Sequence, residues 1–221
     1  MYDFVNRTMS MPDWQADMAQ LLGESISLEG LAPEQREDTI LETYRANLKR
    51  CVTASRPDFP PRSAYVRVMD PERERPKYHL VYVTSHPRGI IEFMTLSEGV
   101  DLVQKRVRAV VQDAKREQRT RTADLFGAES LVDPNVGRAS PDDVDQFWLD
   151  YLGANTRRVD SNAFANILEK TDWPSDLQAS LVRLIDSGAV RNLDAVGRRP
   201  KKPLHFDAKG GERLQRMEKQ V

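Results

Sequence analysis

The sequence predicts a mixed helix-and-strand chain of two domains, an α/β domain followed by a smaller α+β domain. Two observations carry this prediction. Residues 63–85 contain two stretches rich in branched and aromatic residues, as strands prefer, and helical patterns flank them. Residues 140–208 show three amphipathic helical patterns followed by two short strand-like stretches. The 221 residues are enough for two such domains.

Composition limits the possible classes of protein. The chain is 39% hydrophobic and 30% charged with a formal net charge of −1, so attraction to nucleic acid or membrane must be local. Cys51 is the one cysteine, which excludes an internal disulfide and fits a reducing compartment. No apolar run approaches the roughly 18 residues of a membrane span, and the first residues lack a secretion signal. We therefore expect a cytoplasmic protein without membrane contact.

The first domain, expected over residues 1–125, begins with apolar residues typical of a domain interior and continues into a helix at 33–52. Pro33 suits the first turn of this helix, and Cys51 is expected to be a small core residue near its end. The alternating stretches 63–70 and 77–85 are expected to pair as an antiparallel hairpin.

A long helical pattern follows the hairpin, and Gly99 is expected to separate it from a short helix at Ile90. Its apolar positions are Val100, Val103, Val107, Val110, Val111 and Ala114. Its opposite face is basic and carries Lys105, Arg106, Arg108, Lys115, Arg116, Arg119 and Arg121. This basic face is either an ordinary solvated surface or a phosphate-binding ridge.

Residues 126–139 are expected to form a linker, and residues 140–221 a second domain. Ser140 is expected to cap the first helix, Asp160 or Ser161 the second and Ser175 the third, which ends near Gly188. Strands are expected at 189–196 and 204–208, on either side of a loop at 197–203. Three helices followed by a hairpin is the order of a winged helix, with 175–187 as the recognition helix and 197–203 as the wing.

The expected wing is the strongest candidate for a nucleic-acid contact. Basic side chains gather there, and prolines at 200 and 203 stiffen the loop. The candidate nucleic-acid-binding residues are Arg198, Arg199, Lys201 and Lys202, with Arg191 and Arg183 in support. Such a loop suits phosphate contact or insertion of arginine into a minor groove. Only one outward residue of the expected recognition helix is basic, so docking to a protein is the open alternative.

A second candidate is the corner "TSHPRG", where the second strand ends. His86 and Arg88 lie in it, and Asn6 and Arg7 form a further polar set near the N-terminus. His86 either ties down a demanding turn or acts as a hydrogen-bond donor, acid or base. His79 and His86 are seven residues apart and would face opposite sides of a strand, so we expect no metal site. No common nucleotide, metal or nucleophile motif occurs in the sequence, and no catalytic residue is assigned.

Three segments resemble the C-terminal half of the three-Cys-motif partner proteins. They are "MYDFVNR" at the start, "YRANLKRC" from Tyr44, and "YHLVYVTSHPRGIIEFM" from Tyr78. The matching residues are Met1, Phe4, Asn6, Arg7, Tyr78, Leu80, Val81, Thr84, His86, Gly89 and Met94. The resemblance covers about residues 1–100, and more loosely the winged-helix tail, which also occurs in the family.

This resemblance implies a Rossmann-like, methyltransferase-like sheet domain of which the chain holds only the C-terminal remnant. The glycine-rich turn after the first strand of such a domain does not occur in this sequence. Family members are bacterial and phage-associated, and are encoded beside a radical-SAM-like protein with a three-cysteine motif. The expected partners are therefore that protein, DNA or RNA through the wing, and a second copy of the chain.

Three hypotheses for function follow from the sequence. The leading one is a binding module for protein or nucleic acid in bacterial or phage DNA-related processes, inactive as an enzyme by itself and without a cofactor. The alternative is a nucleic-acid methyltransferase that uses S-adenosylmethionine and is completed by a missing N-terminal half. The third is a purely structural subunit.

Overall fold

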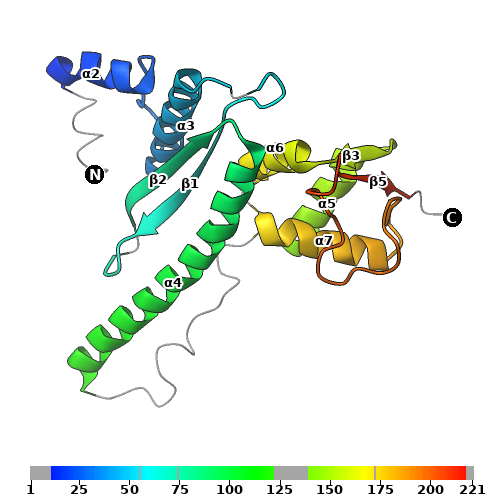
Figure 1. Cartoon of the computed structure of the whole chain (residues 1–221). Coiled ribbons are helices and arrows are strands. Elements are labelled where there is room, and N and C mark those ends of the chain that lie inside the picture. The colour runs from blue at the N-terminus through cyan, green and yellow to red at the C-terminus, as the bar shows by residue number, and fades with distance from the viewer. Residues whose placement is uncertain (1–10, 55, 74, 122–138, 172, 218–221) are drawn as a thin grey trace. The chain divides into compact units, whose positions relative to one another are not determined.

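The computed structural model describes residues 11–54, 56–73, 75–121, 139–171 and 173–217 (Figure 1). The chain is a mixed helix-and-strand protein that divides into two compact units, Met1–His86 and Pro87–Val221. The expected linker at 126–139 falls almost wholly outside the described residues, so that boundary stays a prediction. Among the described residues, no helix combines the length and the apolar character that crossing a membrane requires.

The described residues of the first unit form two helices and a hairpin. Helix α2 spans Pro12–Leu22, helix α3 spans Pro33–Cys51, and strands β1 (Arg62–Met69) and β2 (Pro76–Thr84) pair antiparallel. The structure confirms the expected helix and the hairpin, and adds α2, which the sequence analysis did not assign. Helix α3 contacts α2 and both strands.

A buried arginine joins α3 to the hairpin. Arg45 is 6% exposed, and its Nη2 donates to the carbonyl oxygen of Ser63 at 2.7 Å while Nε donates to Ser63 Oγ at 3.0 Å. The expectation that Cys51 is a core residue is wrong, because its side chain is exposed. Cys51 is the last residue of α3, and the backbone becomes extended at Val52.

The second unit begins with one long helix, α4, over Pro87–Thr120. The expected break at Gly99 is wrong, because the helix continues through it. One glycine costs a helix only about 1 kcal/mol relative to alanine, which the flanking turns offset. The first turns of α4 bury Ile90, Ile91 and Met94, and α4 contacts α6 and α7.

The rest of the unit is a small helix-and-sheet fold. Its helices are α5 (Pro141–Leu152), α6 (Ser161–Thr171) and α7 (Pro174–Asp186), and its strands are β3 (Arg157–Val159), β4 (Val190–Asn192) and β5 (Glu212–Arg216). The strands form an antiparallel sheet in the order β3-β5-β4. Buried Trp148 anchors α5, since its Nε1 donates to the carbonyl oxygen of Leu177 at 3.0 Å.

Details of this fold differ from the sequence predictions. The three helices are confirmed, and Asp160 caps α6 by accepting from the Ala163 N–H at 2.8 Å. Ser175 does not cap α7, because the helix starts at Pro174 and Trp173 holds the cap position. The returning strand lies at 212–216 instead of 204–208, and β3 was not expected.

Gly211 explains where the returning strand begins. Its φ is +67°, and a Cβ at this position would lie 2.4 Å from the Cα of Asp160. Only glycine allows the chain to turn this closely beside the end of β3. Residues 193–211 are therefore one long connection, which we call the β4–β5 loop.

Candidate functional site

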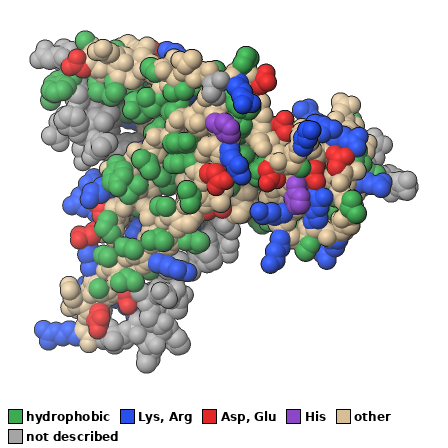
Figure 2. Space-filling view, viewed as in Figure 1, with side chains coloured by type: hydrophobic (Ala, Val, Ile, Leu, Met, Phe, Trp, Pro, Cys, Tyr) green, Lys and Arg blue, Asp and Glu red, His purple; other side chains and the backbone are tan. Residues whose placement is uncertain are grey.

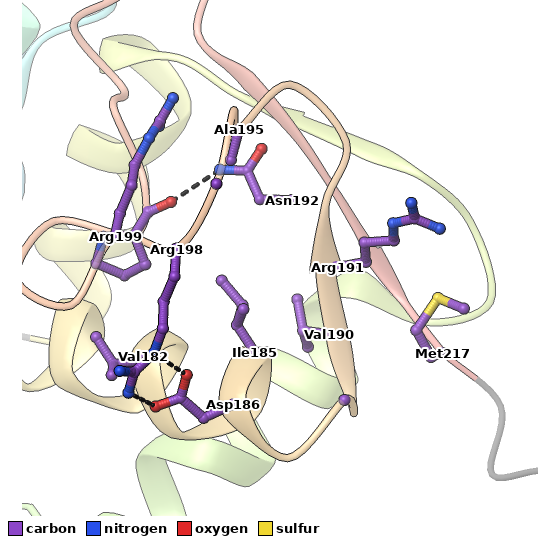
Figure 3. A pocket seen from close by; sticks show the side chains of 13 residues that line it. Val182, Ile185, Asp186, Val190, Arg191, Asn192, Ala195, Arg198, Arg199 and Met217 are labelled. Carbon is purple, nitrogen blue, oxygen red and sulfur yellow. Dashed lines mark hydrogen bonds and ion pairs between the residues drawn. The ribbon is translucent and has the colours of Figure 1, made fainter.

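A cavity of about 290 Å³ lies between α7, β4 and the β4–β5 loop (Figure 3). Its apolar wall includes Val182, Ile185, Val190 and Met217. Three of the six predicted binding residues, Arg191, Arg198 and Arg199, also line it. Arg183, Lys201 and Lys202 do not.

Arg198 holds the loop against the end of α7. Its Nε and Nη2 donate to the two carboxylate oxygens of Asp186 at 2.9 and 2.7 Å, as Figure 3 shows. This hydrogen-bonded pairing lowers the pKa of Asp186 and raises the pKa of Arg198. Because the guanidinium is already paired with a carboxylate, a phosphate would have to compete for it.

Arg199 is part of a second, more buried anchor centred on Glu212. The carboxylate of Glu212 accepts from Arg199 Nη1 at 2.6 Å, from Asn192 Nδ2 at 2.8 Å and from the His205 N–H at 2.8 Å. Burial alone would raise the pKa of Glu212, but these donors outweigh burial and lower it. The Nδ2 of Asn192 also donates to the carbonyl oxygen of Pro203 at 2.8 Å. These bonds tie the middle of the β4–β5 loop, residues 199–205, to β4 and β5.

Arg183 braces two helices. Its Nη2 lies 2.6 Å from Asp145 Oδ1 and 3.2 Å from the carbonyl oxygen of Pro141, so it joins α7 to α5. Ser180 Oγ donates to the same carboxylate oxygen of Asp145 at 2.5 Å. Arg183 therefore has a structural partner on α5.

The other three predicted binding residues are available to solvent. Arg191, Lys201 and Lys202 are exposed, and within the described part of the chain none of the three forms an ion pair. Arg191 lines the cavity from β4, and in Figure 3 its side chain points away from Arg198 and Arg199. The structure thus separates the predicted set into three arginines paired with carboxylates and three exposed cations without such a partner among the described residues.

Sequence analysis missed two basic residues on the outer face of the sheet. Arg158 on β3 and Arg213 on β5 are cross-strand neighbours, and Arg191 on β4 lies on the same face. Arg213 Nη2 donates to Asp194 Oδ1 at 2.6 Å, while Arg158 Nη1 donates to the carbonyl oxygen of Gly210 at 2.9 Å. A three-residue strand such as β3 is too short for an alternation pattern to identify it.

The predicted corner is described only in part, since Asn6 and Arg7 fall outside the described residues. The His86 N–H donates to Thr84 Oγ1 at 3.1 Å, and its ring packs edge-on against Phe59 with centroids 5.4 Å apart. These contacts support the interpretation that His86 fixes the turn after β2. Arg88 is exposed, and its Nε lies 3.7 Å from Glu92 Oε1.

A second cavity, of about 320 Å³, lies in the first unit and is lined mainly by apolar side chains of α2, α3 and β2. His79 and Glu37 also line it, with Nε2 of His79 2.8 Å from Oε1 of Glu37. Within the described ranges, no group of three His, Cys, Asp or Glu residues is arranged to hold a metal ion.

Comparison with known proteins gives no relative from which a function could be transferred. No protein-family model, no curated protein and no solved structure matches the chain.

Proposed function

We propose that the chain is a nucleic-acid-binding module whose residues 141–216 form a winged helix. One observation supports this most: the order helix, strand, two helices, strand, long loop, strand, with the third strand between the other two. In this arrangement α7 is the recognition helix and the β4–β5 loop is the wing.

The exposed cations Arg191, Lys201 and Lys202 make the phosphate contacts. Arg183, Arg198 and Arg199 instead hold the helix and the wing in place through carboxylates of the same chain. The exposed residues of α7 are Ser175, Ala179, Arg183 and Asp186, and the two charged ones are paired with Asp145 and Arg198. Binding is therefore directed at the backbone and depends little on base sequence.

The salt dependence of binding tests this assignment. Three phosphate contacts on duplex DNA give a slope of log affinity against log salt of about −2.7, from roughly 0.9 per contact. We would measure fluorescence anisotropy of labelled duplex DNA, single-stranded DNA and RNA with the full chain over a salt series. The triple variant R191A/K201A/K202A should lose most of the slope.

Two controls make the test specific. Lys170→Ala removes an exposed cation at the end of α6 and should leave the slope unchanged. Arg198→Ala removes the ion pair with Asp186, so it should loosen the β4–β5 loop without changing the number of phosphate contacts. Equal binding by the wild type and the triple variant would overturn the assignment of these three residues.

The cavity beside α7 favours a second candidate function, docking of a protein. Its apolar wall suits an apolar side chain of a partner better than a phosphate. If the wild type binds none of the three nucleic acids even at low salt, this docking function replaces the nucleic-acid one. A variant that fills the cavity, Ala195→Trp, should then abolish capture of the partner.

We also propose, on the resemblance of residues 1–100, that this module works beside a three-Cys-motif protein in bacterial or phage DNA-related processes. Co-expression with such a protein and co-purification would test it.

The methyltransferase alternative predicts binding of S-adenosylmethionine, and titration calorimetry of the full chain would detect it. All strand pairs in the described residues are antiparallel, which lends no support to that alternative.

A further inference from the structure

The distal part of α4 carries an exposed apolar stripe. Its members are Leu96, Val100, Val103, Val107 and Val110, which are between 44% and 68% exposed. Sequence analysis placed these valines on the apolar side of the helix, and the structure buries only residues in the first turns of α4, Ile90, Ile91 and Met94. Figure 2 shows hydrophobic side chains along this helix.

The stripe has the spacing of a coiled-coil seam. Its residues, continued by Ala114, alternate steps of four and three, which places them at a and d positions of successive heptads. From Leu96 to Ala114 the seam is about 27 Å long at 1.5 Å per residue. An exposed a/d seam of this spacing is typical of a helix that packs against a partner helix.

The charges beside the seam favour a second copy of the same helix in antiparallel orientation. With Val100 and Val107 at a positions, Arg106 and Asp113 both occupy g positions. In an antiparallel pair, g positions face each other, so Arg106 of each copy would meet Asp113 of the other. In a parallel pair Arg106 would face Val111, which carries no charge, so no ion pair would form.

Arg106 and Asp113 are available for this pairing. Within the described residues, neither of them takes part in an ion pair. A two-fold axis near Arg108 and Ala109 would place Val107 opposite Val110 of the second copy. The same axis would duplicate the Arg106–Asp113 contact, as a self-complementary interface requires.

We propose that two copies of this chain associate through an antiparallel coiled coil of their α4 helices. The interface consists of the layers in which Val107 meets Val110 and Val103 meets Ala114, together with the two reciprocal contacts between Arg106 and Asp113. Leu96 and Val100 lie beyond these layers, opposite Arg121 and Glu117 of the second copy. This inference concerns α4 alone and does not depend on the nucleic-acid function proposed above.

Sedimentation velocity of the full chain over a concentration series tests the proposal. The wild type should show a monomer–dimer equilibrium, and V103E/V107E should be monomeric because it places charges in the seam. Leu102→Glu is the matched control, since Leu102 is exposed at a c position off the seam, and it should dimerise as the wild type does. Circular dichroism checks that each variant keeps its helix content.

Charge exchange tests the orientation. Arg106→Asp turns both contacts into like-charge contacts and should weaken the dimer by about tenfold. The double variant R106D/D113R restores opposite charges and should recover most of that loss. A monomeric wild type at every concentration, or a dimer that survives V103E/V107E, would overturn the interface. Failure of the double variant to recover affinity would overturn the antiparallel orientation.

Discussion

Replacement of Glu212 by alanine should release the β4–β5 loop from the sheet. The Glu212 side chain is 6% exposed and accepts three hydrogen bonds, from Arg199, Asn192 and the His205 N–H. Without the carboxylate, the His205 N–H and the Arg199 guanidinium lose their partner, whereas Asn192 keeps its bond to Pro203.

The structure sets the size of this effect. A buried donor left without a partner costs about 1–3 kcal/mol, and breaking a buried ion pair costs about 3–5 kcal/mol. Arg199 is 23% exposed and can recover part of its hydration, which reduces the second figure. We therefore expect Glu212→Ala to lower the free energy of unfolding by about 3 kcal/mol. Glu212→Gln retains an acceptor oxygen and should cost about half as much.

Amide hydrogen exchange is the suitable assay, because the two units can unfold separately and a single global midpoint would mix them. Amides of the β4–β5 loop and of β5 should exchange faster in Glu212→Ala. Asp207→Ala is the matched control, since it removes an exposed carboxylate from the same loop. A cost within about 0.5 kcal/mol, the range of ordinary surface substitutions, would refute the anchoring role.

Three further predictions concern the same unit. Gly211→Ala should destabilise it by more than about 1 kcal/mol, as measured by hydrogen exchange of the amides of this unit. The cost arises because alanine would adopt a positive φ and its Cβ would collide with the backbone of Asp160. Trp148→Phe should cost about 2 kcal/mol in the same assay, because the buried carbonyl of Leu177 loses its donor. The side chain and backbone N–H of Arg213 lower the pKa of Asp194 to about 2. A carboxylate whose pKa is lower in the folded state than its unfolded value of 3.8 stabilises the folded state at pH values above 3.8. The contribution of Asp194 to the free energy of unfolding should therefore fade as the pH falls from about 4 to 2. Asp194→Asn should lack this pH dependence.

Patterns within single elements were predictable from the sequence. Helix α3, the hairpin β1–β2 and the helices α5 to α7 all follow from apolar periodicity and from proline at helix starts, because these signals act over a few residues. Asp160 as a cap follows from the same local chemistry.

Contacts between distant residues decided what the sequence left open. The beginning of β5 depends on Gly211 lying against the backbone of Asp160, and that approach exists only once β3 and β5 pair. Val100 and Val107 have the spacing of a core face, but whether an apolar stripe is buried depends on which element covers it.

The basic residues of the candidate site show the same division. Their clustering in a loop between two strands was visible in the sequence, because charge and chain position are local properties. Which of them are free for phosphate depended on carboxylates distant in the chain, since Asp145 lies on α5 and Glu212 on β5. The sequence by itself determined where positive charge accumulates. The tertiary structure decided that Arg183 and Arg199 are neutralised by carboxylates, because an ion pair requires two side chains within about 4 Å of each other.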